Sequence, residues 1–195
     1  MSQHKLAGMK CYLSGSIEAS RDHGIAWRKQ FIDSCWDNDL PFGFIDPCNK
    51  GPGAIQEEIG EERRKLQALK AEGRFDEVTD IMKQVRRWDL RAVDYSNFIV
   101  AVIDRNVPTW GTVDECIVAE RQRKPLIGIV KGGPSQAPDW LFAMMRHDEM
   151  FETADQAVEY LVKLDRGEIP LDKRWIEITG LWENEQRYSL PLLGE

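Results

Sequence analysis

The sequence predicts a single-domain α/β protein with a Rossmann- or flavodoxin-like fold, an open parallel sheet of about four to five strands flanked by helices. Short apolar segments alternate along the chain with longer segments of helical periodicity, which is the order typical of a parallel sheet covered by helices. Residues 98–103 form a continuous apolar run, as expected of a strand buried on both faces. The length of 195 residues lies within the range of one domain.

Four segments have the composition of strands. The first runs into a turn of small residues, and the second is weakened as a strand by Pro41 and Gly43. The third is the clearest, because its apolar run has no polar interruption. The predicted strands are KCYLSG at 10–15, PFGFIDP at 41–47, NFIVAVID at 97–104 and PLIGIV at 125–130.

Helical patterns fill the gaps between these strands. The first gap holds apolar residues at helical spacing, and the second holds a long charged insertion, 54–88, in which Gly73 separates two helices. The charges of the insertion are interpreted as a solvated face. The apolar positions are Trp27, Phe31, Cys35 and Trp36 in the first gap, and Val78, Ile81, Met82, Val85 and Trp88 in the second.

Two further helices and a tail complete the chain. A helix is predicted over 113–124, after the third strand, and a closing helix over 153–164, where Thr153 and Gln156 have the spacing of a capping box. Residues 1–165 are therefore predicted to form the α/β domain. The tail 166–195 contains Pro170, Trp175, Trp182 and Pro191, has no clear period, and is predicted to pack on the domain or on a partner subunit.

Charge and composition exclude several classes of protein. A net charge of −7 and a pI near 5.1 give no general attraction to a nucleic-acid backbone or an anionic membrane. The four cysteines are widely spaced, with no CxxC pair or nearby His, which predicts buried reduced thiols and no metal site. The start of the sequence does not resemble a signal peptide, and no apolar stretch approaches the roughly 18 residues of a membrane span. We therefore expect a cytoplasmic protein with no membrane or long nucleic acid as partner.

Polar clusters follow the first three predicted strands. They are YLSGSIEAS, IDPCNKGPG and IDRNVPTWGTVDE, beginning at Tyr12, Ile45 and Ile103. In an open parallel sheet, ligands bind beyond the carboxyl ends of the strands, so we expect the three clusters to form one site. The first cluster has no GxGxxG or P-loop pattern, which disfavours a dinucleotide or triphosphate ligand.

Three segments between residues 10 and 131 carry a resemblance to a known family. They are YLSGSI, then WDL followed by NFIVAVID, then GTVDE followed by KP and a strand. In this order and spacing the chain resembles the nucleoside 2-deoxyribosyltransferase family, including its hydrolytic branch, the deoxynucleoside 5′-monophosphate N-glycosidases. The positions that match the family pattern are Tyr12, Gly15-Ser16-Ile17, Asp89-Leu90, Gly111 and Glu115.

The resemblance implies cleavage of an N-glycosidic bond by two carboxyl groups. Glu115 would attack the anomeric carbon as the nucleophile, and Asp89 would protonate the leaving base and later activate the incoming base or water. Tyr12 would hold Glu115 by a hydrogen bond. No metal or organic cofactor is expected, and the partners implied are a small-molecule nucleoside or nucleotide and a second copy of the chain. Whether the outcome is transfer or hydrolysis stays open.

One position bears on the phosphate of the substrate. Thr109 stands two residues before the glycine, where the transferases usually have an Asp and the monophosphate hydrolases a Ser that helps bind the 5′-phosphate. The hydroxyls and N–H groups of Ser14, Gly15 and Ser16 are also of the kind that hold phosphate, whereas Glu18 would repel it unless it faces away. The sequence therefore favours a nucleoside 5′-monophosphate.

Two carboxylates near the third strand have alternative interpretations. Asp104 could reach the pocket or could be a turn residue before Asn106. Glu115 has capping-box spacing to Thr112, which alone would favour a helix cap. The position of Gly111, four residues before Glu115, and the upstream pieces in the family order favour the catalytic interpretation instead.

Other functions and an oligomer remain open. Phosphoribohydrolases of the cytokinin-activating type also use a Gly-Thr-x-x-Glu turn, but they usually carry a fuller Gly-Gly-x-Gly-Thr run than TWGTVDE. A non-catalytic nucleotide-binding module on the same fold is the third hypothesis. The family resemblance implies a homodimer or a multiple of one, with the partner's contribution coming from KGGPSQAPDWLFAMM, where Ser135 and Met144 are candidates.

Overall fold

The computed structural model describes residues 4–20, 22–51, 59–107 and 109–179, and its centre is a five-stranded sheet. The strands are β1 (Lys10–Gly15), β2 (Gly43–Ile45), β3 (Phe98–Ile103), β4 (Leu126–Val130) and β5 (Met150–Phe151). They stand in the order β2-β1-β3-β4-β5, and every neighbouring pair is parallel. This is the flavodoxin-like strand order, so the predicted fold class is confirmed.

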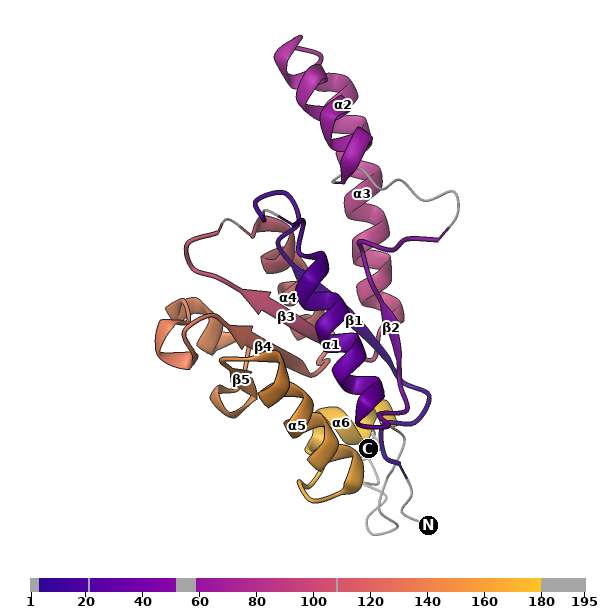
Figure 1. Ribbon diagram of the computed structural model, residues 1–195, viewed down its shortest axis with the longest axis vertical. Coiled ribbons are helices and arrows are strands. Elements are labelled where there is room, and N and C mark those ends of the chain that lie inside the picture. The colour runs from indigo at the N-terminus through magenta and orange to yellow at the C-terminus, as the bar shows by residue number, and fades with distance from the viewer. Residues whose placement is uncertain (1–3, 21, 52–58, 108, 180–195) are drawn as a thin grey trace, which may run out of the picture.

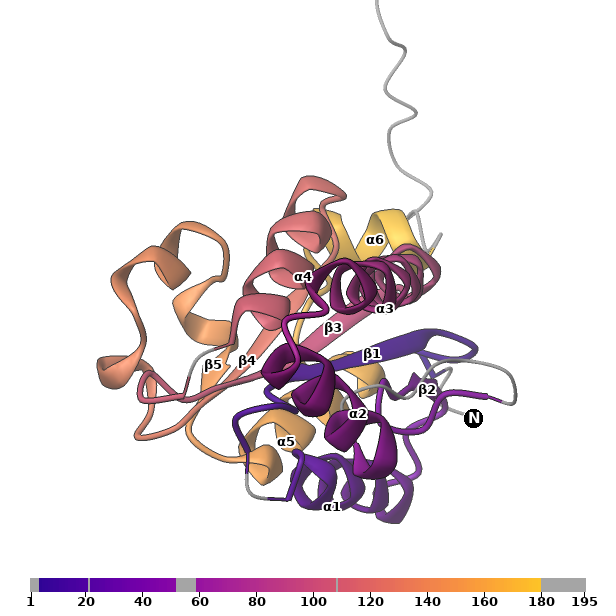
Figure 2. The same cartoon turned by 90° about the horizontal axis from the view of Figure 1, so that it is seen from above.

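Helices cover both faces of the sheet. They are α1 (Ile25–Asp37), α2 (Gly60–Ala71), α3 (Phe75–Tyr95), α4 (Trp110–Arg121), α5 (Ala154–Arg166) and α6 (Lys173–Thr179). Seen from above, α3 and α4 lie on one side of the strands, and α1 and α5 lie on the other (Figure 2). Within the described ranges, no helix combines the length and the apolar character needed to cross a membrane.

Successive side chains of β1 pack into two separate halves of the core, one on each face of the sheet. Cys11 and Leu13 are fully buried on one face, where they join a cluster with Phe31 of α1. Tyr12 is fully buried on the other face, in a cluster with Cys116 of α4. Because successive side chains of a strand point to opposite faces, a single short strand contributes to both layers.

Some element boundaries differ from the prediction. The second strand is shorter than 41–47, because Pro41 has no N–H for the strand ladder and Asp46 already begins a turn. The helix predicted to start at Val113 begins at Trp110, since the Thr109 carbonyl accepts the Val113 N–H at 2.9 Å. The fifth strand has two residues, too few to show a period in the sequence.

The charged insertion forms a helical hairpin. Gly73 lies between α2 and α3 with φ of 73°, as the predicted break requires, and α2 with the start of α3 projects away from the sheet (Figure 1). Five apolar residues of α3 were predicted to form one face of this helix. Val85 is buried, and the other four are half-buried. Residues 54–58 of the insertion lie outside the described ranges.

The helix patterns are confirmed with one exception. Thr153 Oγ1 accepts the N–H of Gln156 at 3.3 Å, and the Gln156 side chain bonds back to the Thr153 N–H, which completes the predicted capping box of α5. In α1, Phe31 and Cys35 are buried as predicted. Trp36 is 62% exposed, because it lies about 100° around the helix from Cys35.

The described part of the tail packs on the domain. Trp175 of α6 is 1% exposed, and its ring centre lies 5.2 Å from that of Phe98 at the start of β3. Arg174 makes two hydrogen bonds, of 2.8 and 3.0 Å, to the buried carboxylate of Glu149. Residues 180–195, and with them Trp182 and Pro191, lie outside the described ranges.

Candidate active site

The predicted polar clusters meet at one edge of the sheet, where β1, β2 and β3 have their carboxyl ends. The chain passes from β1 to the edge strand β2 and then returns to β3 on the other side of β1. The crevice between β1 and β3 is therefore the topological switch point, where ligands of open α/β sheets bind. Side chains from β1, α3 and α4 approach this point.

Glu115 lies on the face of α4 that packs against the sheet. The buried residues of this helix are spaced i, i+3, i+4 and i+7, and they are Thr112, Glu115, Cys116 and Ala119. Such a stripe normally contains apolar residues, and a glutamate is almost never fully buried without partners. With only 7% of the residue exposed, the Glu115 carboxyl group depends on the groups that surround it.

Two hydroxyl groups of β1 hold this carboxyl group. Tyr12 Oη donates a hydrogen bond of 2.8 Å to Glu115 Oε1, and Ser14 Oγ donates one to Oε2. Tyr12 and Ser14 are two residues apart on a strand, so both face α4. The bond from Tyr12 was predicted, whereas Ser14 was predicted to bind phosphate and here has its hydroxyl on Glu115. The capping box with Thr112 is not formed, because Thr112 lies inside α4.

The electrostatic environment of Glu115 favours its protonated form. The pKa of Glu115 is raised to about 8, mainly by burial and also by the charge of Asp89. The hydrogen bonds from Ser14 and Tyr12 and the charge of Arg28 act in the opposite direction, but they are weaker. Burial and the neighbouring Glu115 carboxylate also raise the pKa of Tyr12 well above its usual range. The tyrosine therefore stays a hydrogen-bond donor at neutral pH.

Asp89 comes to the site from α3. Its side chain is 18% exposed, and its Oδ1 lies 3.2 Å from the Nζ of Lys50. Lys50 belongs to the loop after β2, and its ammonium also lies 4.6 Å from the centre of the Trp88 ring. The charge of Asp89 raises the pKa of Glu115 and that of Tyr12. The two predicted catalytic carboxyl groups therefore interact electrostatically.

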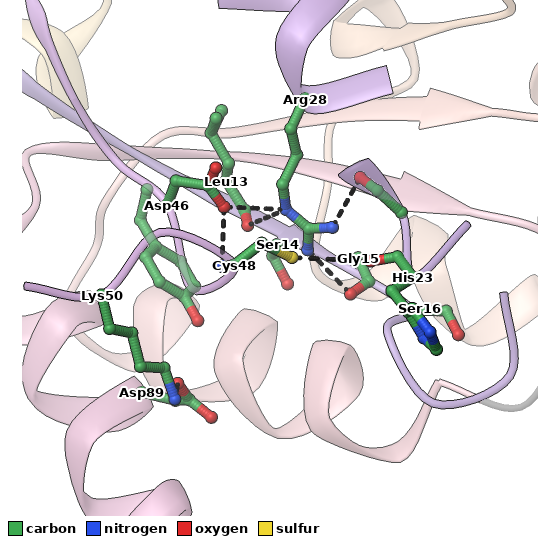
Figure 3. A network of polar contacts seen from close by, with 12 residues as sticks. Leu13, Ser14, Gly15, Ser16, His23, Arg28, Asp46, Cys48, Lys50 and Asp89 are labelled. Atoms are coloured by element: carbon green, nitrogen blue, oxygen red, sulfur yellow. Dashed lines mark hydrogen bonds and ion pairs between the residues drawn. The ribbon is translucent and has the colours of Figure 1, made fainter. Parts of the chain in front are cut away.

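A buried arginine supports the turn after β1. The Arg28 guanidinium donates to the carbonyls of Leu13, Gly15 and Gly24 at 3.3, 3.0 and 2.9 Å, and its Nε lies 3.4 Å from Asp46 Oδ1 (Figure 3). Only 1% of Arg28 is exposed. The residue therefore ties β1 to α1 and to the loop after β2. One sequence feature is consistent with this role: Arg28 stands three residues before Phe31, on the apolar face of its helix.

The turn itself contains the predicted Gly15-Ser16-Ile17. Gly15 is required by its surroundings, because a Cβ there would lie 2.9 Å from a ring carbon of Trp27. The Ser16 carbonyl accepts a hydrogen bond from Ser20 Oγ at 3.1 Å, and the Ile17 carbonyl lies 3.4 Å from His23 Nδ1. The turn is thus held on both sides, and Ser16 and Ile17 are half-buried at the edge of the site.

Three further predicted residues lie after β3. Thr109 is half-buried directly before α4, and among the described residues its side chain makes no cap bond to that helix. Gly111 is exposed, and a Cβ at this position would meet nothing within 4 Å. Asp104 accepts the Asn106 N–H at 2.9 Å and pairs with Lys131 at 2.8 Å, which lowers its pKa. Asp104 therefore has the turn role, and its contact with a substrate stays a prediction.

The rest of the described chain contains a cavity but no metal-binding group of side chains. A cavity of about 520 Å³ lies at the far end of α4, lined in part by Arg123, Phe142, Met145 and Lys173, and it includes none of the predicted catalytic residues. The described residues contain no group of three His, Cys, Asp or Glu side chains that could hold a metal ion. Glu115 and its partners are therefore the group from which a function is argued.

Comparison with known proteins identifies no family. No family model matches the chain, and no curated protein matches it. Among solved structures, the chain is similar to a conserved protein from Enterococcus faecalis V583, with 15% identity over 82% of this chain and 89% of that one, and a TM-score of 0.45. At this level the similarity says nothing about activity.

Proposed function

We propose that this protein cleaves the N-glycosidic bond of a deoxynucleoside or of its 5′-monophosphate, as members of the nucleoside 2-deoxyribosyltransferase family do. Glu115 is the nucleophile that forms a covalent bond to the anomeric carbon of the sugar. Asp89 is the acid that protonates the departing base. It then acts as the base that activates water in a hydrolase or a second nucleobase in a transferase.

The hydrogen bonds of Glu115 are the observation that carries this proposal. A glutamate on the buried face of α4 accepts one hydroxyl on each of its two oxygens, from Tyr12 and Ser14, at the switch point of the sheet. A side chain held in this way has a fixed orientation, which a nucleophile needs for attack on one carbon atom. A glutamate that merely capped α4 would instead bond to the first N–H groups of that helix.

The surroundings of Thr109 favour a 5′-monophosphate as the substrate. Thr109 lies at the start of a twelve-residue helix, where free N–H groups and the helix dipole favour an anion. Glu18, which would repel phosphate from within the site, is 69% exposed on its side chain and lies 3.8 Å from Lys70 of α2. Its charge therefore faces the helical hairpin and solvent.

A homodimer belongs to the same proposal. In the segment KGGPSQAPDWLFAMM, Trp140 is 73% exposed and Phe142 is 48% exposed, while Ser135 is exposed and Met144 is half-buried. Apolar side chains of this size gathered in one short segment are typical of an interface. Analytical ultracentrifugation of the purified protein tests this part, and a monomer at all micromolar concentrations would contradict it.

Base release is the direct test of the activity. The purified protein is incubated with dAMP, dGMP, dCMP and dTMP and with the four deoxynucleosides, each with and without an acceptor base, and the products are separated by chromatography. Glu115→Gln should abolish release, and mass spectrometry should detect a deoxyribosyl adduct on the wild-type protein only. Glu120→Gln, on the exposed side of the same helix, is the matched control and should release base at the wild-type rate.

The same assay, repeated with the four ribonucleoside 5′-monophosphates, separates the alternatives. Release from ribonucleotides only would favour the phosphoribohydrolase hypothesis. Saturable nucleotide binding without release, unaffected by Asp89→Asn, would favour a non-catalytic binding module. A Glu115→Gln protein with unchanged activity would remove Glu115 from the role of nucleophile.

A further inference from the structure

Lys50 lies buried beside the carboxylate assigned as the general acid. Only 3% of its side chain is exposed, and its Nζ lies 3.2 Å from Asp89 Oδ1 and 4.6 Å from the centre of the Trp88 ring. Figure 3 shows the ends of the Lys50 and Asp89 side chains next to each other. A lysine is almost never buried without a charged partner, and an aromatic face also attracts an ammonium group. The loop after β2 therefore brings a positive charge into direct contact with Asp89.

Within the described part of the chain, Lys50 is the buried cation in contact with Asp89. Arg28, which is also buried, donates to three backbone carbonyls and lies 3.4 Å from Asp46. Among the residues that the structure describes, the titratable and polar groups that face the two carboxyl groups come from five elements. They are Tyr12 and Ser14 from β1, Arg28 from α1, Asp46 and Lys50 from the loop after β2, Asp89 from α3 and Glu115 from α4.

These contacts determine where a proton lies in the free protein. An ammonium group at 3.2 Å favours the ionised form of Asp89. Burial raises the pKa of Glu115 to about 8, and the charge of Asp89 contributes to the rise. In the free protein these contacts favour a proton on Glu115 and a negative charge on Asp89. The proposed reaction also needs one proton and one negative charge on the pair, but in the opposite arrangement, with Glu115 ionised and Asp89 protonated.

We propose that Lys50 is a positioning residue that decides which of the two carboxyl groups holds this proton. In the free protein it keeps Asp89 ionised. When a hydrogen-bond acceptor of the bound base binds the Lys50 ammonium group in place of Asp89, Asp89 accepts the proton and Glu115 becomes the carboxylate. This inference rests on the proposed function, and it adds a residue and a step to it.

The step is balanced in protons and charge. The proton leaves the Glu115 carboxyl group and binds to the Asp89 carboxylate, so no charge is gained or lost. Glu115 then forms a bond to the anomeric carbon while the bond from that carbon to the base breaks, and Asp89 gives its proton to the base. Because Asp89 must contact the base to protonate it, an ammonium group 3.2 Å from Asp89 Oδ1 can contact the base as well.

A titration without substrate tests the first half of the inference. Aspartate labelled with ¹³C at the carboxyl carbon is incorporated into the full chain, and Asp89→Asn assigns the Asp89 signal. We expect the Asp89 midpoint to rise by at least about one pH unit in Lys50→Met and in Lys50→Gln, and to stay at the wild-type value in Lys50→Arg, which keeps the charge. An unchanged midpoint in both neutral variants, shown by circular dichroism to be folded, would overturn the inference.

The pH dependence of base release tests the second half. Both limbs of the kcat/KM profile should move to higher pH in the neutral variants, by about the same one unit, because a cation that favours ionisation is gone. Lys50→Arg should leave the limbs in place, and so should Lys163→Met, which removes an exposed lysine paired with Glu159. A slower rate with unmoved limbs in the neutral variants would show a merely structural role. If no nucleotide releases a base, the proposed function fails, and the titration still decides whether Lys50 sets the charge of Asp89.

Discussion

The hydroxyl of Tyr12 donates a hydrogen bond of 2.8 Å to Oε1 of Glu115, a residue 103 positions later in the sequence. The bond joins the first strand to the helix after the third strand, so it forms only when the sheet has its native strand order. With Ser14 on the second oxygen, it gives a buried carboxyl group two fixed donors. These donors lower the pKa of Glu115, but burial outweighs them and the pKa is raised to about 8.

The raised pKa predicts a stability that falls as the pH rises. The pKa of Glu115 is about 8 in the folded protein and 4.5 ordinarily, so the stabilisation is complete below about pH 4.5 and is lost as the pH rises towards 8. The full difference corresponds to at most about 5 kcal/mol. Glu115→Gln should lack this dependence, because an amide does not ionise. Urea unfolding across this range measures it, and Glu120→Gln should keep the wild-type slope.

Removal of the Tyr12 hydroxyl should affect both stability and activity. Tyr12→Phe leaves Glu115 Oε1 without its donor, which should cost about 1 to 3 kcal/mol of unfolding free energy. Since the lost bond lowered the pKa of Glu115, less of the nucleophile is ionised, and we expect base release at neutral pH to fall at least about tenfold.

Tyr160→Phe is the matched control for this variant. Its hydroxyl donates to Glu149 Oε1 at 3.1 Å, away from the switch point of the sheet. A comparable loss of stability with unchanged base release is the expected result. If the two variants lost activity equally, the effect of Tyr12→Phe would reflect general destabilisation rather than its bond to Glu115.

Sequence patterns predicted the fold well where a strand or helix is long enough to show a period. The apolar run 98–103 became β3, one residue shorter at each end than the predicted strand 97–104, and Gly73 separates α2 from α3. The two-residue β5 shows no period, and the turn at Asp46 shortens β2. Backbone hydrogen bonds at the ends of these elements decide such boundaries, and a pattern of side chains does not report them.

The candidate site was predicted less completely than the fold. The contact between Tyr12 and Glu115 followed from the family resemblance, but the role of Ser14 did not, because a serine at the carboxyl end of a strand is equally typical of phosphate binding. Arg28 and Lys50 were missed, because charged residues in a helix or loop are usually exposed. Only the three-dimensional contacts show that these two cations are buried.

Replacement of Arg28 should destabilise the protein strongly. Arg28→Met leaves three backbone carbonyls and Asp46 without a buried donor, which should cost about 3 to 5 kcal/mol. Arg28→Lys keeps the charge but cannot reach all three carbonyls, so we expect an intermediate loss. Chemical denaturation measures both. Arg74→Met removes an exposed arginine paired with Glu72 and Glu77, and it should leave the midpoint of unfolding unchanged.

The turn before α1 should not tolerate a side chain at Gly24. Its φ is 69°, and a Cβ would lie 2.5 Å from Nη1 of Arg28 and 2.7 Å from the Ser16 carbonyl oxygen. Gly24→Ala should therefore cost about 3 kcal/mol or more, from backbone strain and close contacts together. Gly73→Ala has a similar φ of 73° and nothing within 4 Å, so it should cost only the strain, about 1 kcal/mol. Equal losses in the two variants would contradict the close approach at Gly24.

Gly111 offers a test in which stability and activity should move in opposite directions. It lies four residues before Glu115 on the same face of α4, and a Cβ there would meet no atom within 4 Å. Gly111→Ala should leave stability unchanged or raise it by up to about 1 kcal/mol, because alanine favours a helix.

If the sugar in the proposed reaction approaches Glu115 along this face of α4, a methyl group added at Gly111 would obstruct it. We therefore expect kcat/KM for base release to fall at least about tenfold in a protein that unfolds no more easily than the wild type. Val113→Ala changes a residue about 200° around the helix and should leave the rate unchanged. A fully active Gly111→Ala protein would mean that the substrate does not approach Glu115 over this turn of α4.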